Sequence, residues 1–431
     1  MCMGVCRAPS CVVAATPSRD WCGPDEMSEL QVLLPRGGCL QALMTAPDLP
    51  AFGELQQAFA AALSRALTQS PSARQHPELV ALGFWLRPAH LHRLMEAARA
   101  RLATQWIQPR GLCFHVAPGN VDTIFVYSWI VSLLCGNRSV VRLSSRDSDQ
   151  IRALLESLGG LLEQPEWAEI ARRVMVVRYA HDEQLNTELS AACDMRIIWG
   201  GDTAVRTLRS IPLSTTATEL CFPDKFSLAV LDAGAVAALD DAGLRQLAHR
   251  FTADAYSFGQ MGCSSPRLVL WVGAPEAARG AAERFWESVA HRLDSYAHGL
   301  EAADAMNARV AADLLAMDQS GIQVLTARSP LLRVWLDRPA VLSDAHCGGG
   351  LFHESSFEDF DALQGLWTRR VQTISSFGTS QEQWHRWLSR APMGGIDRIV
   401  PVGRALDFDP LWDGQDLWAA FTRCIAWQEP Y

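Results

Sequence analysis

The sequence predicts an α/β fold whose parallel sheets are covered by helices. From Gly111 onward, short apolar segments alternate with longer segments of helical periodicity. Four such strand and helix units fit into about a hundred residues, a spacing that suits parallel strands joined by crossover helices. The chain has 431 residues, of which 49% are hydrophobic. It is therefore long enough for two or three packed units.

The first part of the chain is predicted to be helical. Apolar residues recur with helical spacing over 51–67 and 88–102, and a Pro- and Ser-rich break at 70–77 separates the two segments. We assign residues 1–105 to an N-terminal helical segment.

The next part is predicted to form one parallel sheet. Strands are expected at 112–116, 139–143, 174–178 and 195–199, and helices at 121–134, 148–162, 182–192 and 202–211. This architecture usually binds nucleotides. We therefore assign residues 106–228 to a cofactor-binding domain.

A second α/β lobe is expected after this domain. Strands are predicted at 227–231, 267–272, 322–325 and 332–336, helices at 241–258, 275–293 and 301–317, and a strand and helix pair at 370–388. Pro275 suits a first helical position, where its missing N–H would be unpaired in any case. We assign residues 229–395 to a catalytic domain and residues 396–431 to a C-terminal segment that ends in a short Trp-rich helix.

Composition excludes several classes of function. The net charge is −9 and basic residues do not cluster, which argues against nucleic-acid binding. Lys225 is the only lysine in the chain. A P-loop, which needs a Gly-Lys pair, cannot be written, and Schiff-base chemistry would have to rest on Lys225.

The sequence shows no segment that would cross or enter a membrane. The longest apolar stretch, 123–136, is shorter than the ~20 residues of a membrane span. The apolar run at 12–15 is shorter than the ~7–15 residues of a secretory signal. We expect a cytoplasmic protein without a membrane span.

We expect no metal site. Cys2, Cys6, Cys11 and Cys22 have no C-x-x-C spacing and no histidine signature beside them. Three aspartates near the C-terminus lack the ligand spacing and terminal Glu of a calcium loop, so turn and cap roles are expected for them. They are Asp407, Asp409 and Asp413.

Two loops are candidates for chemistry. Cys263 lies in the Gly- and Ser-rich loop 259–266, where backbone N–H groups can solvate a thiolate. Gly200 and Gly201 follow a predicted strand and precede a helix, a place where free N–H groups can hold a phosphate, although such a pair is more often plain loop geometry. The G-x-G-x-x-G dinucleotide fingerprint is absent after the first strand.

Taken together, the loops resemble a known family. The motifs are VAPGNVD at 116–122, GNRSVVRLSSR at 136–146, MRIIWGGD at 195–202, TEL at 218–220, FGQMGCSSP at 258–266 and DRIVPVGRALDFDPLWDG at 397–414. They resemble the LuxC-like acyl-CoA reductases of bacterial bioluminescence, within the aldehyde dehydrogenase superfamily. The resemblance implies an aldehyde-dehydrogenase-like fold, with a Rossmann-type cofactor lobe and an α/β catalytic lobe.

The resemblance also implies roles for three residues. Cys263 stands at the position of the nucleophile, and Asn120 at that of the asparagine that stabilises the oxyanion. Glu219 is similar in position to the superfamily glutamate that handles protons. The glycines that usually follow this glutamate are replaced here by Cys221-Phe222-Pro223.

Cofactor contacts are implied in the same way for the loop residues Pro118, Ser144, Ser145, Gly200 and Gly201. Arg142 stands where many aldehyde dehydrogenases have a lysine near the adenine ribose, and no acidic residue follows it within three places. Arginine attracts a ribose 2′-phosphate, whereas a carboxylate would repel it. We therefore expect NADPH in preference to NADH.

These assignments predict NADPH-dependent reduction of an acyl thioester, carried by CoA or by an acyl-carrier protein, to an aldehyde. The partner is the thioester substrate, and we expect a homo-oligomer or a member of a reductase complex. Two alternatives keep Cys263 as nucleophile: an oxidative NAD(P)-dependent aldehyde dehydrogenase, and a thiol acyltransferase or thioesterase without redox activity.

Overall fold

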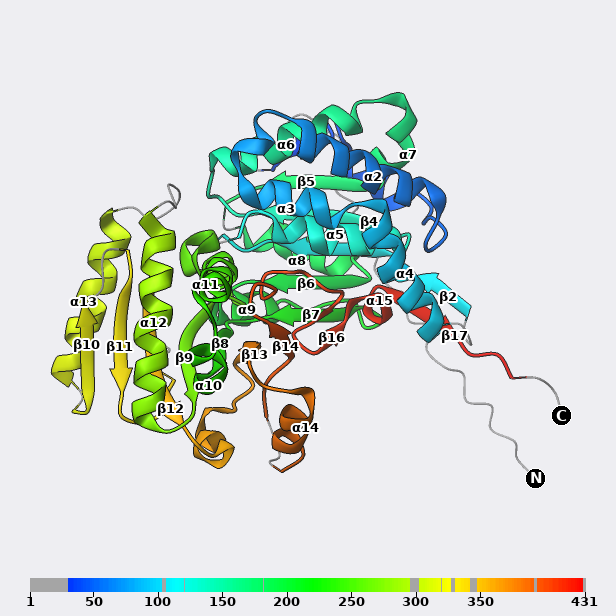
Figure 1. The fold of residues 1–431 in the computed structure, drawn as a ribbon. Helices are drawn as coiled ribbons and strands as arrows, with labels where there is room; N and C mark the ends of the chain where they lie inside the picture. The colour runs from blue at the N-terminus through cyan, green and yellow to red at the C-terminus, as the bar shows by residue number, and fades with distance from the viewer. Residues whose placement is uncertain are drawn as a thin grey trace, which may run out of the picture.

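The computed structural model describes residues 30–102, 106–119, 121–180, 182–294, 302–318, 320–326, 330–341, 347–390 and 394–428. These residues form two α/β lobes, with the first lobe at the top of Figure 1 and the second at the lower left. The candidate cysteines Cys2, Cys6, Cys11 and Cys22 lie outside the described residues. No helix among the described residues is long and apolar enough to cross a membrane.

A six-stranded sheet forms the centre of the first lobe. Its strand order is β1-β5-β4-β3-β6-β7. All neighbouring pairs are parallel except β1 with β5. The strands are β1 (Gln31–Leu34), β3 (Leu112–Val116), β4 (Arg138–Leu143), β5 (Val174–Arg178), β6 (Met195–Trp199) and β7 (Thr218–Phe222). The predicted parallel sheet is confirmed, with β1 and β7 as additional edge strands.

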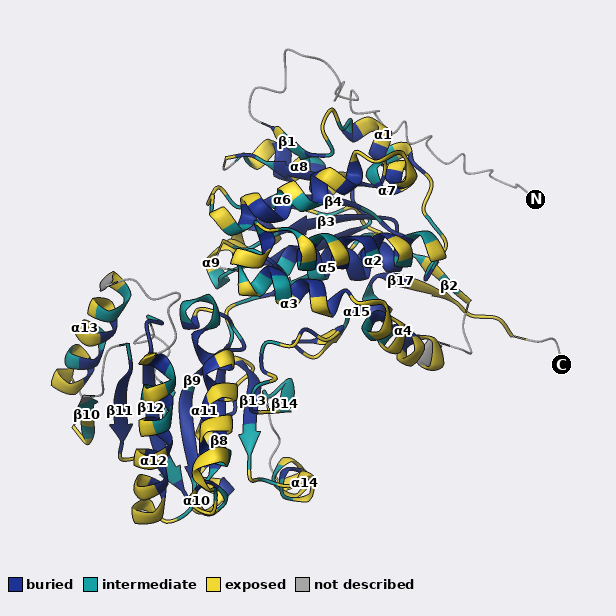
Figure 2. Cartoon of the chain, turned by 45° about the horizontal axis from the view of Figure 1, so that its top comes forward, coloured by how far each residue is buried: buried dark blue, intermediate teal, exposed yellow. Residues whose placement is uncertain are grey.

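Helices cover both faces of this sheet. They are α1 (Leu40–Thr45), α2 (Glu54–Gln69), α3 (Pro77–Trp85), α4 (Pro88–Leu102), α5 (Ile124–Leu134), α6 (Asp149–Leu162), α7 (Ala168–Ala171), α8 (Glu183–Ala192) and α9 (Asp202–Arg209). Ser148 and Asp182 cap α6 and α8 by accepting a backbone N–H three residues ahead, which satisfies an otherwise unpaired donor. The buried strands lie between helices whose outer faces are exposed (Figure 2).

The helices that precede the sheet belong to the first lobe. Apolar residues of α2, α3 and α4 share one hydrophobic core with α5 and α6. The expected N-terminal helical segment therefore packs on the cofactor-binding domain in its described residues.

A seven-stranded sheet forms the centre of the second lobe. Its strand order is β10-β11-β12-β9-β8-β13-β14, and only β10 is antiparallel to its neighbour. The strands are β8 (Phe226–Asp232), β9 (Pro266–Val272), β10 (Ile322–Thr326), β11 (Leu332–Leu336), β12 (Leu351–Phe357), β13 (Val371–Phe377) and β14 (Arg398–Pro401). The two sheets separate at residues 223–225, between β7 and β8.

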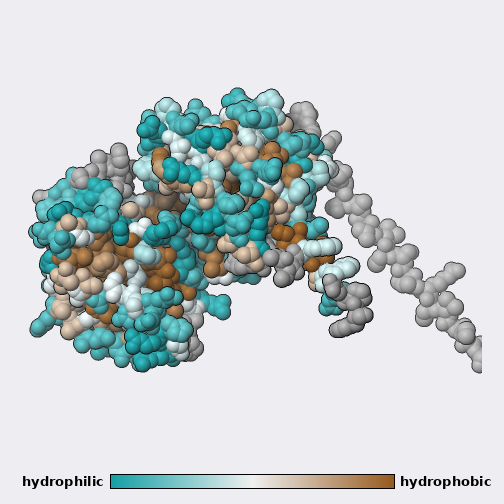
Figure 3. Space-filling model, turned by 45° about the vertical axis from the view of Figure 1, so that its right-hand side comes forward, coloured by the Kyte–Doolittle hydropathy of each residue, from teal (hydrophilic) through white to brown (hydrophobic). Residues whose placement is uncertain are grey.

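Helices also cover the second sheet. They are α10 (Ala233–Ala237), α11 (Asp241–Tyr256), α12 (Pro275–Asp294), α13 (Ala302–Asp318) and α14 (Gln381–Arg390), with the 3-10 segments η3 (Ser257–Gln260) and η5 (Phe360–Leu366). α11 and α12 pack on one face and η5 and α14 on the other. The surface of this lobe shows hydrophobic residues among hydrophilic ones (Figure 3).

The C-terminal segment joins the two lobes. It starts with β14 in the second sheet and returns to the first lobe, as the red trace in Figure 1 shows. A short hairpin of β15 (Leu411–Trp412) and β16 (Gln415–Asp416) follows, then α15 (Leu417–Ala420). The last strand, β17 (Thr422–Ile425), pairs with β2 (Trp106–Pro109). This return path brings residues near position 410 back to the junction of the lobes.

Candidate active site

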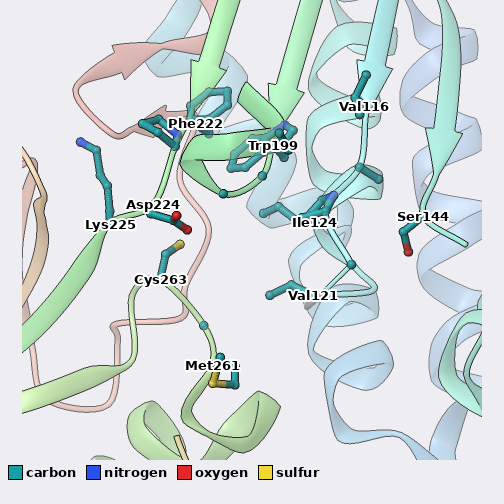
Figure 4. Close-up of a pocket in the computed structure, with 18 of the residues that line it drawn as sticks. Val116, Val121, Ile124, Ser144, Trp199, Phe222, Asp224, Lys225, Met261 and Cys263 are labelled. Carbon is teal, nitrogen blue, oxygen red and sulfur yellow. The ribbon is translucent and has the colours of Figure 1, made fainter. Parts of the chain in front are cut away.

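A cavity of about 840 Å³ lies between the two lobes. Residues at the carboxyl ends of β3, β4, β6 and β7 form one wall, and the loop before β9 and the C-terminal segment form the other. Ligands of open α/β sheets bind at this edge of the strands. Figure 4 shows Trp199 and Phe222 at their strand ends, with the Cys263 sulfur directed toward that end of the sheet.

The six residues predicted to contact the cofactor all line this cavity. They are Pro118, Arg142, Ser144, Ser145, Gly200 and Gly201. Cys263 lines the same cavity. The structure therefore brings the predicted cofactor residues and the predicted nucleophile together.

Arg142 is held against an aromatic ring at the cavity wall. Its guanidinium carbon lies 4.6 Å from the centroid of the Tyr179 ring, a geometry typical of a cation–π contact. The Tyr179 hydroxyl donates a hydrogen bond to Asn186 at 2.9 Å, which fixes the ring. The Nε of Arg142 is buried without a hydrogen-bond partner. A fixed guanidinium with an unpaired nitrogen fits an anionic ligand group such as a phosphate.

The two-glycine turn has a different environment from the one predicted. Gly201 is the N-cap of α9, and the next N–H, that of Asp202, donates to the Asp224 carboxylate at 2.9 Å. A Cβ on Gly201 would lie 3.1 Å from the same carboxylate. This carboxylate occupies one of the N–H groups expected to bind a phosphate, and its charge disfavours a second anion there.

The Cys263 loop is shaped by three consecutive residues with left-handed backbone angles. Phe258, Gly259 and Gln260 have φ values of 54°, 60° and 66°. Such angles are costly for Phe and Gln, so the surrounding contacts must hold them. The fully buried Gln260 amide donates to the Pro266 and Leu351 carbonyls at 3.2 and 2.9 Å and accepts the Gly350 N–H at 3.0 Å. The loop base is thereby fixed on β9 and β12.

Hydrogen bonds from neighbouring strands hold Cys263 itself. The Ser227 hydroxyl on β8 donates to the Cys263 carbonyl at 2.7 Å and accepts the Thr373 N–H at 3.1 Å. Gln372 on β13 donates an amide N–H to the Cys263 sulfur at 3.2 Å. The same amide nitrogen lies 2.5 Å from the Asp413 carboxylate. The sulfur thus has a defined donor in the resting structure.

The thiol of Cys263 is protonated at neutral pH in this state. Burial raises its pKa to about 11, and the Asp413 carboxylate adds to the rise. The Gln372 N–H and the Arg267 guanidinium act in the opposite direction. Arg267 lines the cavity, and its Nε is buried without a hydrogen-bond partner. Reactivity therefore requires a ligand or a local change that favours the thiolate.

Glu219 does not reach the cavity. Successive side chains of a strand point to opposite faces of the sheet. Leu220 and Phe222 face the hydrophobic core that Cys263 also contacts. Glu219 and Cys221 therefore face the opposite side. The Glu219 carboxylate accepts from Arg196 Nε at 2.8 Å and from Arg209 Nε at 3.0 Å. The expected proton-handling carboxylate is therefore engaged in an ion pair on the other face of the sheet.

Asn120 lies outside the described residues. Its neighbours Gly119 and Val121 both line the cavity, and Val121 points into it in Figure 4. The oxyanion role of Asn120 stays a prediction.

Sequence reasoning missed Gln372, and it assigned Asp413 only a turn role. Asp413 and Gly414 are the two-residue turn between β15 and β16, with φ values of 50° and 71°. This is the geometry that Asp-Gly favours in hairpins, so the turn role is confirmed. The Asp413 side chain also lines the cavity. No sequence signal pointed to Gln372, because strand pairing alone brings it to the cysteine.

The three aspartates near the C-terminus have separate partners. Asp409 accepts the Leu411 N–H at 2.8 Å, as expected for a turn, and Asp407 pairs with Arg404. Among the described residues, no group of three His, Cys, Asp or Glu side chains is arranged to hold a metal ion.

Comparison with known proteins agrees with the predicted resemblance. Residues 87–321, more than half of the chain, match the family described as acyl-CoA reductase (LuxC). A long-chain acyl-protein thioester reductase 2 of Photobacterium leiognathi is 25% identical over 191 residues, which cover 44% of this chain and 36% of that protein. A long-chain acyl-protein thioester reductase of Aliivibrio fischeri is 27% identical over 169 residues, 38% of this chain and 33% of that protein. The match thus spans about a third of the length of these relatives.

Solved structures share the fold. An NAD-dependent aldehyde dehydrogenase from Sinorhizobium meliloti superposes with a TM-score of 0.61 over 89% of this chain and 84% of that one, at 14% sequence identity. The expected aldehyde-dehydrogenase-like fold, with two α/β lobes, is confirmed.

Proposed function

The chain belongs to the LuxC family of acyl-CoA reductases, and from this premise we propose that it reduces an acyl thioester to an aldehyde through an acyl-enzyme on Cys263, with NADPH as the hydride donor. The thioester is carried by CoA or by an acyl-carrier protein. The observation that carries the proposal is the shared cavity, in which Cys263 and all six predicted cofactor residues are lining residues.

In the first step the Cys263 sulfur attacks the thioester carbonyl. The thiol first loses its proton, and the thiolate is stabilised by the Gln372 N–H and the nearby Arg267 charge. A new carbon–sulfur bond forms to Cys263, and the bond to the leaving thiolate breaks, after which that thiolate takes up a proton. The product is an acyl-enzyme. An oxyanion forms on the way, and Asn120 is proposed to stabilise it, a contribution typically worth ~10²–10³ in rate.

The nicotinamide supplies the hydride that reduces the acyl group when it is bound. The residues that would hold it are Pro118, Arg142, Ser144 and Ser145, with the backbone at Gly200 and Gly201 beside them. The unpaired Arg142 nitrogen supports a 2′-phosphate contact, and hence NADPH over NADH. Cys263 then leaves as the aldehyde is released, and its thiolate is again stabilised by the same donors.

Because Glu219 does not reach the cavity, we propose that another group transfers protons. The carboxylates of Asp224 and Asp413 line the cavity, whereas Glu219 does not. Since burial raises the pKa of Asp413 to about 6, this group can exchange a proton near neutral pH. We therefore propose that protons reach the reacting atoms from the Asp413 side of the cavity.

The experiment that tests the proposal separates acylation from reduction. Purified protein is mixed with a panel of acyl-CoA thioesters, first without NADPH, and the Cys263 peptide is searched for an acyl adduct by mass spectrometry. NADPH consumption and aldehyde release are then measured. Cys263→Ala is expected to abolish the adduct and NADPH consumption, whereas Cys424→Ala, at an exposed cysteine, retains both.

Three other outcomes would contradict the proposal, and two of them would identify a different enzyme. NADPH consumption by Cys263→Ala at the wild-type rate would overturn the proposal. Faster turnover of aldehyde with NADP⁺ than of thioester with NADPH would show an oxidative aldehyde dehydrogenase. An adduct that forms and turns over without any nicotinamide binding would show an acyltransferase or thioesterase. Sedimentation velocity of the same sample tests the proposed homo-oligomer.

A further inference from the structure

Three side chains connect the C-terminal hairpin to the reactive sulfur. Asp413, in the turn between β15 and β16, accepts a hydrogen bond from the Gln372 amide nitrogen at 2.5 Å. The same nitrogen donates to the Cys263 sulfur at 3.2 Å. The three residues come from separate parts of the chain, 109 and 41 positions apart. The fold, and not local sequence, creates the contact.

The Gln372 amide has a fixed orientation. The side chain is fully buried, and its oxygen accepts the Thr373 hydroxyl at 3.3 Å. Its two N–H donors face a carboxylate and a sulfur. Reversing the amide would place its oxygen against both acceptors, which is unfavourable because an ionised carboxylate has no hydrogen to donate. The carboxylate of Asp413 therefore selects the orientation that directs an N–H to the sulfur.

Charged groups from four elements surround this contact. Arg267 on β9 and Arg398 on β14 both interact electrostatically with the thiol, and Asp413 opposes them. Lys225, just before β8, pairs with Asp397, just before β14. Asp224 interacts with Arg267. Lys225, Asp397 and Arg398 also interact electrostatically with Asp413, and Asp413 is the carboxylate that accepts the Gln372 N–H.

The turn itself does not require an aspartate. A two-residue turn with positive φ at both positions accepts Asn-Gly and Gly-Gly as well as Asp-Gly. A turn role alone would therefore leave the residue at this position free to be Asn or Gly. The contact with Gln372 gives the carboxylate a second role.

We propose that Asp413 is a positioning residue for Cys263: it holds the Gln372 amide with one N–H directed at the sulfur, and this N–H stabilises the thiolate. The proposal rests on the proposed function only in taking Cys263 as the nucleophile. Gln372 contacts the reacting atom, whereas Asp413 acts through Gln372. The same contact stabilises the sulfur when the acyl-enzyme forms and when Cys263 is released from the product.

The test measures the reactivity of the thiol without substrate or cofactor. The full-length protein is alkylated with iodoacetamide between pH 7 and 10, and the Cys263 peptide is quantified by mass spectrometry because other cysteines also react. In this reaction the Cys263 thiolate forms a bond to the methylene carbon of iodoacetamide, and the carbon–iodine bond breaks to release iodide. The result does not depend on which thioester the enzyme uses, so failure of the reductase proposal and failure of this one are distinguishable.

Gln372→Met removes both N–H groups at nearly constant volume. Losing a hydrogen bond to a charged group should lower the fraction of Cys263 present as thiolate about tenfold to a hundredfold. A thiolate of higher pKa is also a stronger nucleophile, which offsets about half of this loss on a logarithmic scale. We expect alkylation of Cys263 to slow about threefold to tenfold. Alkylation as fast as in the wild type would overturn the proposal.

Asp413→Asn and Asp413→Gly separate positioning from charge, since both suit the turn and both remove the negative charge. Asn keeps an acceptor for the Gln372 amide, whereas Gly does not. We expect Asn to alkylate at least as fast as the wild type and Gly about threefold or more slower than Asn. Equal rates for Asn and Gly would show that Asp413 acts only through its charge and would overturn the proposal.

Asp409→Gly is the control in the same segment, because Asp409 is exposed, accepts a local N–H and does not contact Gln372 among the hydrogen bonds of the described residues. It is expected to alkylate at the wild-type rate. Thermal melting of each variant confirms that it is folded. If Asp413→Gly does not fold, Asp413→Asn is compared in the wild-type and Gln372→Met backgrounds, and an equal effect on alkylation in both would overturn the proposal.

Discussion

Glu219→Gln separates a catalytic role of this glutamate from a structural one. The resemblance to aldehyde dehydrogenases implies proton transfer beside the nucleophile, whereas the structure places Glu219 in an ion pair with Arg196. A glutamine keeps the size and one acceptor oxygen but removes the charge. A structural role predicts a loss of stability, and a catalytic role predicts a loss of rate in a stable protein.

The expected loss of stability follows from the burial of the partner. Arg196 is 1% exposed, and its guanidinium also donates to Ser190 and to the Ile211 carbonyl, so it cannot turn toward water. Breaking a buried ion pair by removing one partner costs ~3–5 kcal/mol. Because the Glu219 side chain is 17% exposed and Gln keeps one hydrogen bond, we expect about 2–3 kcal/mol.

Urea unfolding measures this change, with Glu166→Gln as the control at an exposed glutamate. Glu219→Gln should unfold at a lower urea concentration with an unchanged slope, and Glu166→Gln should unfold as the wild type does. At a temperature where the variant is folded, the rate of Cys263 acylation should stay within about threefold of the wild type. A variant of wild-type stability with a hundredfold slower acylation would refute the structural argument.

Three further predictions concern the thiol, the cofactor and the junction of the lobes. The alkylation rate of Cys263 should rise about tenfold per pH unit from pH 7 to 10, because burial raises its pKa to about 11; a plateau below pH 9 would contradict this. Arg142→Gln should raise the KM for NADPH about tenfold or more relative to that for NADH, and an unchanged KM ratio would show that no phosphate contact exists. Trp85→Phe removes the buried donor that bonds the Phe408 carbonyl at 2.9 Å, so the free energy of unfolding should fall by about 1–3 kcal/mol, measured by urea unfolding; a smaller change would show that water replaces the indole.

The sequence was informative about the fold wherever burial and periodicity agree. The strands β3, β5, β6 and β11 begin and end where the apolar runs do. β12 was missed because three of its buried positions, at 353–355, are polar: Glu354 is 0% exposed and bonds Arg333 and two indoles. A hydrophobicity pattern predicts that a segment with a carboxylate and other polar residues lies at the surface, even when these residues are buried with their partners. Only tertiary contacts could identify that strand.

The site was predictable where loop position determines it. Residues directly after parallel strands meet at one edge of the sheet, so Ser144 and Gly200 could be grouped without knowing the sheet order, together with Arg142 near the end of its strand. The motif around Glu219 does not determine which face of the sheet its side chain lies on. Side chains alternate between the faces along a strand, so a shift of one residue moves the side chain to the opposite face. Gln372 required the pairing of β13 with β8.

The lone lysine shows why charge pairing decides the chemistry of this cavity. Lys225 lines the cavity, yet its ammonium is bonded to Asp397 with 11% of its side chain exposed. This ion pair engages the nitrogen that would have to attack a carbonyl to form a Schiff base. Arg267 lines the same cavity with a buried Nε that bonds nothing. The Arg267 guanidinium interacts electrostatically with the Cys263 sulfur and with the Asp224 carboxylate, and a positive charge beside the sulfur favours a thiolate nucleophile.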